Sequence, residues 1–427
     1  MKRNYLEMTK EELLCEKELL EKAYGEKKAL GLTLDMSRGK PDSNQLDISN
    51  GLLNVLDGAS CKTEAGFDTR NYGILAGIPE ARGLIADLCG VESNNVIIGG
   101  TSSLDVMYNT VVRAMLFGTG NGKTPWIKQG KVKFLCPAPG YDRHFGICAD
   151  LGIEMIPVKM TDHGPDMDEI ERIASSDASV KGIWCVPKYS NPDGITYSDE
   201  TVRRIANLSP AADDFRVFWD NAYFIHDVTD TPDTLLNIFD IIRGTKNEDL
   251  VYMFMSTSKV TFPGGGISAF ISSKKNVEYA LSHIGFQTIC YDKINQLRHV
   301  KFFKNADGVR AHMQKHKEYL KPKFDAVTER FESELAGRGI AKWKKPNGGY
   351  FVSLYVKNGT ARRVGELCRN AGVTLTPVGA TYPYGIDPDD SNIRIAPSYP
   401  SHKELSAAMD ILCICVRLAA LESLLKQ

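Results

Sequence analysis

Residues 251–259 decide the fold, and they read Val-Tyr-Met-Phe-Met-Ser-Thr-Ser-Lys. The five apolar residues at the start predict a strand that is covered on both faces, and a polar turn with a lysine follows it directly. Other short apolar runs alternate with helical stretches, which is typical of an α/β domain with a mostly parallel sheet. The expected strands are 96–98, 132–136, 153–158, 182–186, 217–219, 251–255 and 267–271, and the expected helices are 79–89, 103–117 and 199–208.

Polar residues follow several of these strands at their carboxyl ends. Asp220 follows strand 217–219, and Ser256-Thr-Ser-Lys259 follows strand 251–255. Because the carboxyl ends of parallel strands meet at one crevice, we expect these segments to surround a single ligand. The other segments are Gly99-Gly-Thr-Ser-Ser103 after strand 96–98, Pro139-Gly-Tyr141 after strand 132–136 and Asn191-Pro-Asp-Gly194 after strand 182–186.

The residue types in these segments indicate what the ligand carries. A glycine-rich turn with hydroxyl groups that opens a helix suits a phosphate, and an aspartate at a strand end can hold a cationic ring nitrogen. An aromatic side chain can stack on a planar ring. Asparagine and tyrosine can hold a phenolic oxygen, and a lysine can form an imine with an aldehyde. Phosphate, pyridinium, phenolate and aldehyde together describe pyridoxal phosphate.

The composition is that of an ordinary globular chain of 427 residues. Its 52 basic and 53 acidic residues leave a net charge of −1, which gives no field that favours nucleic acid or a membrane. Residues 1–20 lack the apolar core of a signal peptide, and no apolar run approaches the roughly 18 residues of a membrane span. The ten cysteines have no CxxC spacing, so we expect reduced, buried cysteines in a cytoplasmic protein.

The pattern changes after about residue 306, which predicts a second, smaller α/β domain. At the other end of the chain, Thr9 and Glu12 predict a capping box that opens a helix through about residue 29, and we expect this helix to pack beside the C-terminal elements. The predicted domains are a small one of residues 1–50 and 307–427 and a large cofactor-binding one of residues 51–306. The expected C-terminal elements are a long helix over 309–335 and the segments 348–355, 361–371, 393–396 and 403–425.

Three further patterns resemble sites but favour ordinary structure. Residues 118–124 resemble a phosphate-binding P-loop, but the spacing fails because residue 117 is Phe, so we expect a surface loop. His312 and His316 lie four apart in a helix without an accompanying glutamate, so we expect no metal site. Residues 293–323 carry nine Lys or Arg, which favours a solvated helix face, with a few members turned toward an anionic ligand, over a nucleic-acid patch.

Taken together, the motifs resemble those of fold-type I, pyridoxal-phosphate-dependent aminotransferases of class I. The most similar branch is that of the type Ic aspartate aminotransferases, also described as MocR-like aminotransferases, and the resemblance covers residues 34–418. It implies a large domain with a mostly parallel sheet covered by helices, and a smaller α/β domain built from both chain ends. The motifs are Ser37-Arg-Gly-Lys-Pro41, Gly100-Thr-Ser-Ser-Leu104, Pro139-Gly-Tyr-Asp-Arg-His144, Asn191-Pro-Asp-Gly194, Asp220-Asn-Ala-Tyr223, Ser256-Thr-Ser-Lys259 and Asn295-Gln-Leu-Arg-His299.

The resemblance implies roles for the residues that hold the cofactor. Lys259 would form a Schiff base with pyridoxal phosphate and move a proton during catalysis. Asp220 would keep the pyridine nitrogen protonated, with His144 as its partner unless His144 is a surface residue. Asn191 and Tyr223 would hold the ring oxygen. The other implied contacts are Tyr141 on the ring face and Gly100, Thr101, Ser102, Ser103, Ser256 and Ser258 at the phosphate.

The resemblance also implies a homodimer with shared active sites. Tyr72 matches a tyrosine that reaches the phosphate of the neighbouring subunit, and symmetric dimers are common. Lys293 lies about where the family inserts residues of the neighbouring subunit into the site. A class I enzyme usually has a phosphate-binding arginine at the position of Gly266, so Lys293 and Arg70 become candidates to supply that cation.

Substrate contacts follow from the same resemblance. Arg394 matches the arginine that clamps the substrate α-carboxylate, beside Asn191, with a buried salt bridge as the alternative. Arg38 and Gly39 lie in a loop that passes close to the substrate, so Arg38 would bind the second carboxylate of a dicarboxylate. The alternative for Arg38 is an ion pair with Asp35 or Asp42.

These roles predict an aspartate aminotransferase that exchanges amino groups between small-molecule amino acids and 2-oxoglutarate in a ping-pong cycle. One alternative is a pyridoxal-phosphate lyase of the C–S type or another type, because such an enzyme also needs Lys259 and Asp220. A second alternative is a ligand-sensing regulator, which would carry a DNA-binding domain ahead of this one. Only about 30 residues precede the first motif, and their positive and negative charges cancel. This short segment argues against the regulator.

Overall fold

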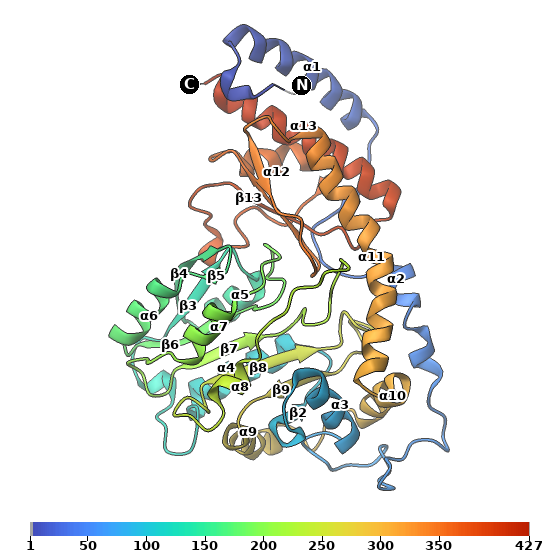
Figure 1. The fold of residues 1–427 in the computed structure, drawn as a ribbon, viewed down its shortest axis with the longest axis vertical. Helices are drawn as coiled ribbons and strands as arrows, with labels where there is room; N and C mark the ends of the chain where they lie inside the picture. The colour runs from blue at the N-terminus through green and yellow to red at the C-terminus, as the bar shows by residue number, and fades with distance from the viewer. Residues whose placement is uncertain (1–2, 427) are drawn as a thin grey trace.

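The structure is a computed structural model that describes residues 3–426. Its lower part in Figure 1 is built on an eight-stranded sheet. All neighbouring strands from β8 through β4 run parallel, whereas β9 is antiparallel to both β2 and β8, and β5 is antiparallel to β4. The spatial order is β2 (Val96–Ile98), β9 (Ser268–Ile271), β8 (Val251–Ser256), β7 (Arg216–Asp220), β6 (Val180–Cys185), β3 (Lys133–Ala138), β4 (Glu154–Thr161) and β5 (Gly164–Pro165).

Helices cover both faces of this sheet. Successive strand residues point to opposite faces, so Val217 and Trp219 pack into one apolar cluster while Phe218 packs into the other. The first cluster includes α3 (Pro79–Cys89), α6 (Met167–Ser176), α7 (Asp199–Ala206) and α8 (Ile238–Ile242), and the second includes α4 (Ser103–Phe117), α5 (Asp142–Asp150) and α9 (Lys274–Gln287). The predicted α/β arrangement, a mostly parallel sheet covered by helices, is therefore confirmed.

The upper part has its own core, to which both ends of the chain contribute (Figure 1). Its elements are an antiparallel sheet of β10 (Ala341–Trp343), β11 (Val352–Val356) and β13 (Asn392–Ile395), a parallel pair of β1 (Leu34–Asp35) and β12 (Val373–Thr374), and the helices α1 (Lys10–Ala29), α12 (Ala361–Asn370) and α13 (His402–Leu424). Thr9 and Glu12 form the predicted capping box, and α1 packs on α13 as expected.

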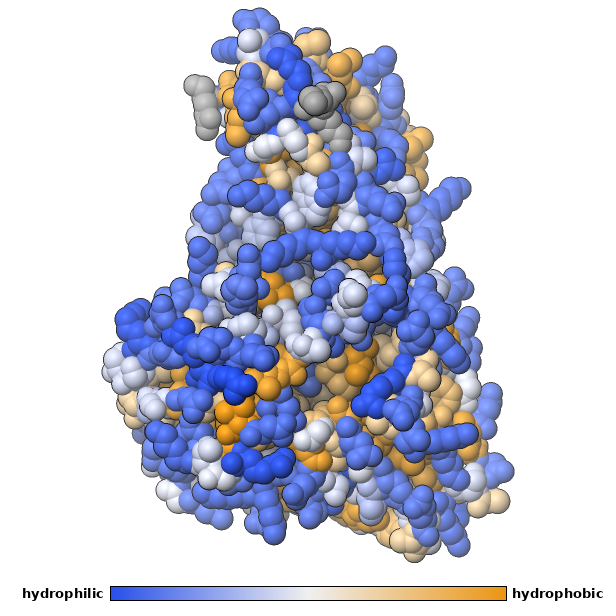
Figure 2. Space-filling view, in the orientation of Figure 1, coloured by the Kyte–Doolittle hydropathy of each residue, from blue (hydrophilic) through white to orange (hydrophobic). Residues whose placement is uncertain are grey.

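One long helix connects the two parts, with a second helix before it in the chain and a short helix beside it. α11 (Ala306–Glu334) runs from the lower part into the upper part, and α10 (Lys293–Phe303) precedes it in the lower part (Figure 1). The short α2 (Ser43–Asp47) lies beside α11, since the side chain of Gln45 contacts His316. Hydrophilic side chains cover most of the face in Figure 2, and apolar side chains gather just below the waist between the two parts.

The sequence located α3 and α4 at their observed bounds, but it missed α5, α6, α8 and α9. The expectation for residues 293–323 was only partly right, because Lys293, His299, His312, His316 and Lys323 are buried. Lys323 donates to Oδ2 of Asp42, just before α2, at 2.6 Å. It also donates to the carbonyl oxygens of Ser398 and Pro400, so it joins α11 to both segments.

The remaining patterns behave as ordinary structure. Residues 118–124 form a loop after α4, and His312 and His316 are hydrogen-bonded to each other with 3.1 Å between their Nε2 atoms. All ten cysteines are free thiols; seven are buried, Cys15 is exposed and Cys89 and Cys290 are half-buried, so burial was overestimated for three. Within residues 3–426, every helix is too short or too polar to cross a membrane.

Candidate active site

Hydroxyl groups tie the turn after β8 to the turn after β2. Ser256 Oγ donates to Ser258 Oγ at 3.2 Å, and Ser258 Oγ donates to the carbonyl oxygen of Thr101 at 3.0 Å. The two turns meet because β2 and β8 point the same way, with the reversed β9 between them. Ser102 caps α4 by accepting a hydrogen bond from the N–H of Leu104. Hydroxyls beside a helix N-terminus suit an anion such as a phosphate.

Gly100 and Ser103 complete this phosphate-type turn. The carbonyl oxygen of Gly100 accepts hydrogen bonds from both the N–H and the hydroxyl of Ser268, each at 2.8 Å, which fixes the turn against β9. Ser103 is the first residue of α4. The four residues that the sequence singled out, Gly100 to Ser103, thus connect a strand to the positive end of a helix.

Asp220 ends β7 and is held by His144 from α5. Nε2 of His144 lies 3.0 Å from Oδ2 of Asp220, and both side chains are buried. The His144 ring stacks on Trp184, with 4.4 Å between centroids and 7° between planes, which fixes its orientation. The predicted partnership of His144 with Asp220 is confirmed, and the surface alternative is wrong.

The second carboxylate oxygen of Asp220 has a different environment. Oδ1 is buried and lacks a hydrogen-bond partner among residues 3–426. Leaving a buried acceptor without a donor costs free energy, so this atom is arranged for a donor that the protein does not itself supply. A protonated ring nitrogen provides such a donor together with a compensating charge.

Lys259 projects from the turn after β8 toward two tyrosine rings. Its Nζ lies 4.9 Å from the ring centroid of Tyr223 and 5.9 Å from that of Tyr350. Burial lowers the pKa of Lys259, and the charge of Asp220 opposes that shift. Burial also raises the pKa of Tyr223, so its phenol remains protonated and can donate a hydrogen bond.

A cavity of about 910 Å³ brings the two parts of the molecule together at Lys259. Its walls come from the loop after β1, the start of α5, the β6–α7 connection, α12 and β13. The residues predicted from the sequence that line it are Arg38, Gly39, Tyr141, Asn191, Tyr223, Lys259 and Arg394.

Arg394 lies in β13 and is buried with its guanidinium over the ring of Phe351, 4.7 Å from the centroid. Nε donates to Oγ1 of Thr376 at 3.2 Å, and Nη1 donates to Oδ1 of Asp142 at 2.9 Å and to Oδ1 of Asn191 at 3.2 Å. The salt-bridge alternative is therefore realised with Asp142. Nη2 makes no hydrogen bond to any of residues 3–426, so its two N–H groups are left for a carboxylate.

Arg38 is exposed at the cavity wall, and within the described chain its side chain has no ion pair or hydrogen bond. Asp35 accepts hydrogen bonds from Ser37, and Asp42 pairs with Lys323, so the two proposed alternatives for Arg38 are wrong. Gly39 gives the loop room to pass Phe351, because a Cβ on Gly39 would lie 2.6 Å from that ring.

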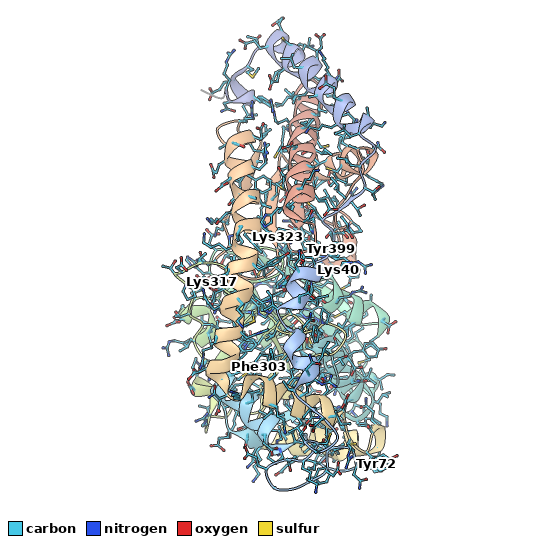
Figure 3. All side chains as sticks on the ribbon, turned by 90° about the vertical axis from the view of Figure 1, so that its right-hand side faces the viewer. Lys40, Tyr72, Phe303, Lys317, Lys323 and Tyr399 are labelled. Carbon is cyan, nitrogen blue, oxygen red and sulfur yellow. The ribbon has the colours of Figure 1, made fainter. Side chains whose placement is uncertain are left out.

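Tyr72, Lys293 and Arg70 do not line this cavity within the chain. Tyr72 is 72% exposed and lies at the lower end of the molecule in Figure 3, whereas Lys40, which lines the cavity, lies near mid-height. Lys293 is buried, with its Nζ 5.9 Å from the Phe67 ring, whereas Arg70 is exposed and paired with Asp68 at 2.6 Å.

Sequence reasoning missed several residues of the cavity wall. Asp142 and Thr376 accept hydrogen bonds from Arg394, and the ring of Phe351 packs against its guanidinium. α12 contributes Arg362, Gly365, Glu366 and Arg369. The spacing of three, four and seven along α12 puts these residues on one helix face, which was a signal available in the sequence.

Comparison with known proteins gives consistent results over nearly the whole chain. A family model described as aspartate amino-transferase matches residues 8–427. An aspartate aminotransferase of Corynebacterium glutamicum is 44% identical over 403 residues, covering 94% of this chain and 93% of that protein.

Solved structures give the same picture. The crystal structure of an aspartate transaminase from Corynebacterium glutamicum is 42% identical with a TM-score of 0.95, covering 98% of this chain and 99% of the other. An α-aminoadipate aminotransferase from Thermus thermophilus, complexed with N-(5'-phosphopyridoxyl)-L-leucine, has a TM-score of 0.73 at 16% identity, covering 92% of this chain and 93% of the other. This second likeness is one of fold.

Proposed function

This chain belongs to the aspartate aminotransferase family, and from that premise we propose that it transfers the amino group of aspartate to 2-oxoglutarate in a ping-pong cycle. It is a pyridoxal-phosphate-dependent aminotransferase of fold type I. The choice of aspartate and 2-oxoglutarate is our proposal, and it rests on the two arginines of the cavity.

One observation carries the choice of substrate: Arg38 and Arg394 line the same cavity as Lys259. Arg38 has every guanidinium N–H free among residues 3–426, and Arg394 keeps the two N–H groups of Nη2, so each arginine can donate to a carboxylate. A dicarboxylate would place its α-carboxylate at Arg394 and its second carboxylate at Arg38.

The charge of the cavity wall supports the same conclusion. Five arginines line it against only two acids, in a chain whose net charge is −1. Clefts lined by one sign of charge concentrate ligands of the opposite sign. The five arginines are Arg38, Arg143, Arg362, Arg369 and Arg394, and the acids are Asp142 and Glu366.

The donor set fits pyridoxal phosphate, with the unpartnered Oδ1 of Asp220 as the observation that tests the fit. We propose that Asp220 receives the pyridine N–H, that Asn191 and Tyr223 bind the ring oxygen, and that Tyr141 covers the ring. The hydroxyls of Ser256 and Ser258 and the turn from Gly100 to Ser103 would bind the phosphate. When bound, the cofactor supplies an electron sink for the bond changes at the substrate α-carbon.

The protein's own groups then have defined tasks. Lys259 would hold the cofactor covalently, and its Nζ would move the proton between the substrate α-carbon and C4′ of the cofactor. Because burial lowers the pKa of Lys259, the neutral amine that this task requires is favoured. Arg394 and Asn191 would hold the α-carboxylate, Thr376 would orient Arg394 by accepting from its Nε, and the phenol of Tyr223 would donate to the ring oxygen.

We also propose that the active unit is a homodimer in which Tyr72 of each subunit reaches the phosphate of the other. Tyr72 is 72% exposed and Phe286 is 94% exposed, so both side chains are accessible to a second subunit. Burial of Lys293 without an ion pair among residues 3–426 agrees with an anion supplied from elsewhere.

Two further proposals concern organisation and compartment. We propose that residues 1–50 and 307–427 form the small domain and residues 51–306 the large one. Most residues of the upper core come from the first two ranges, and the two clusters on the large sheet come from 51–306, while Val309 and Met313 of α11 pack with the large domain. Ten unbridged cysteines fit a reducing compartment, which supports a cytoplasmic enzyme.

A panel of amino donors with 2-oxoglutarate as acceptor tests the proposed reaction. We expect glutamate formation to be fastest with aspartate, and oxaloacetate to appear in equal amount. Release of ammonia or of a side-chain fragment without glutamate would indicate a lyase, and a faster rate with a monocarboxylate donor would contradict the role given to Arg38.

A further inference from the structure

The connection between β8 and β9 carries Lys259 on a chain with little regular structure. It contains three consecutive glycines, Gly264 to Gly266, and its ends are joined by a hydrogen bond from the N–H of Thr257 to the carbonyl oxygen of Ile267 at 2.8 Å. Glycine-rich backbone is conformationally free, so a lysine that must point at one atom needs support from another element.

α10 supplies one support through Asn295. Nδ2 of this buried side chain donates to the carbonyl oxygens of Gly265 and Gly266, at 3.0 and 2.9 Å. Its backbone N–H is in turn bonded to the side chain of Asp292, which caps the helix. The glycine segment is therefore bound to a fixed helix terminus.

Gly266 transmits this contact to the active-site turn. A Cβ at this position would lie 3.0 Å from the backbone nitrogen of Ser258 and 3.1 Å from Oγ1 of Thr257. The glycine backbone thus packs directly against the residue before Lys259. A side chain at this position has no space, and a shift of Gly266 would displace Ser258.

His299 supplies the second support, one helical turn after Asn295. Its Nδ1 lies 2.8 Å from the carbonyl oxygen of Asn295, which can only accept, so Nδ1 carries the proton. Its Nε2 therefore accepts, with Oγ1 of Thr257 at 3.0 Å and Oγ1 of Thr261 at 3.1 Å. These threonines stand two residues before and two residues after Lys259.

We propose that Asn295 and His299 are positioning residues that hold Lys259 and the backbone of Ser258 in the geometry that binds the cofactor. The proposal rests on the role given to Lys259 above. In this proposal, two uncharged side chains of α10 fix the position of the glycine segment, which has no cationic side chain of its own.

The test compares two asparagines with the same local structure. Asn276 also stands at the third position of a helix, is buried, and donates from Nδ2 to a carbonyl oxygen, that of Asp249 at 2.9 Å, beside the opposite end of β8. Asn295→Asp and Asn276→Asp each keep the side-chain volume and remove the donor. The readouts on the holoenzyme are the dissociation constant of pyridoxal phosphate and the midpoint of the pH titration of its absorbance.

We expect Asn295→Asp to weaken cofactor binding by about tenfold or more, equivalent to about 1.4 kcal/mol, and to move the absorbance midpoint. Asn276→Asp should lower the melting temperature without either change. Equal effects of the two variants on both readouts would overturn the proposal, and so would an unchanged Asn295→Asp enzyme.

His299 gives a second, independent arm. Gln can present an acceptor near the position of Nε2, whereas Leu cannot, so His299→Gln should retain cofactor affinity and His299→Leu should lose it. If Gln fails as badly as Leu, His299 has only a packing role. Neither arm uses an amino-acid substrate, so these results do not depend on aspartate being the substrate. Lys259→Ala shows separately whether the measured absorbance comes from the cofactor bound to Lys259.

Discussion

The Nη1 atom of Arg394 donates to Oδ1 of Asn191 at 3.2 Å, and so joins β13 of the upper part to the connection after β6 of the lower part. One of these residues is proposed to hold the substrate and the other the cofactor ring. Because the two side chains are bonded to each other, a change in either one alters the orientation of both ligands.

We expect Arg394→Lys to reduce kcat/KM for every amino donor. Lysine cannot keep the donors to Thr376, Asp142 and Asn191 at once. Loss of one side of a buried charged interaction costs about 2–5 kcal/mol, which corresponds to roughly 30- to several-thousand-fold in kcat/KM. Steady-state kinetics with aspartate and alanine measure this, and a loss confined to aspartate would contradict the α-carboxylate role.

We expect Arg38→Ala to distinguish dicarboxylate substrates from the others. Arg38 has no ion pair within the described residues, so its removal should leave the fold intact while kcat/KM for aspartate falls by the same roughly 30-fold or more. Activity with alanine or an aromatic donor should change little. The matched control is Arg172→Ala, an exposed arginine of α6. Equal losses on all donors would show that Arg38 supports the cofactor or the fold, and no loss would make Lys40 or Lys293 the next candidates.

We expect Lys259→Ala to retain non-covalent cofactor binding but to lose nearly all turnover. Borohydride treatment of the wild-type protein should fix the cofactor on the peptide that contains Lys259, as measured by mass spectrometry. Labelling of any other peptide would refute the assignment of Lys259.

We expect Lys293→Met to weaken cofactor binding by about tenfold or more, since a buried cation without an ion pair is suited to a phosphate. Arg70→Met should have a smaller effect, because Asp68 already neutralises Arg70. Equilibrium dialysis of the holoenzyme measures both. If neither variant binds the cofactor more weakly, the cation that serves the phosphate lies elsewhere.

Acid should destabilise the protein through His299. Burial lowers the pKa of His299 to about 4, against 6.5 for an exposed histidine. Between these pH values the unfolded state binds a proton at His299 that the folded state does not, so the contribution of His299 to stability falls as the pH drops from about 6.5 to about 4 and is constant below. At about 1.4 kcal/mol per pH unit this amounts to about 3 kcal/mol. Urea unfolding of the wild type and of His299→Gln at several pH values should show a steeper loss in the wild type; parallel curves would contradict this.

The central sheet was predictable because its strands carry a local signal. Every residue of the run 251–255 is apolar, which predicts a buried strand. A polar turn directly after a buried strand indicates a binding site, so the site residues could be predicted as well. The bounds of α3 and α4 were also predictable, since a proline opens one and a serine cap precedes the other.

The missed features depend on contacts between distant residues. α5 follows directly from the Pro139–His144 motif, and its short amphipathic pattern is hidden by that motif. The hydrogen bonds from Asn295 to Gly265 and Gly266 join segments about 30 residues apart, and no local pattern specifies them. Whether Lys293 and Tyr72 serve a site also depends on a second subunit, which one sequence does not place.

α11 contributes residues to the apolar cores of both parts of the molecule. Its 29 residues extend about 43 Å at 1.5 Å per residue, as one helix that belongs to two cores. Val309 and Met313 pack in the lower core with Val260, the residue after Lys259, while Phe324 and Phe331 pack in the upper core. The contacts around Val260, the neighbour of the lysine, and the core of the upper part therefore share one helix. Pro322 lies inside that helix between the two sets of contacts, where it cannot donate the backbone hydrogen bond of a regular helix turn.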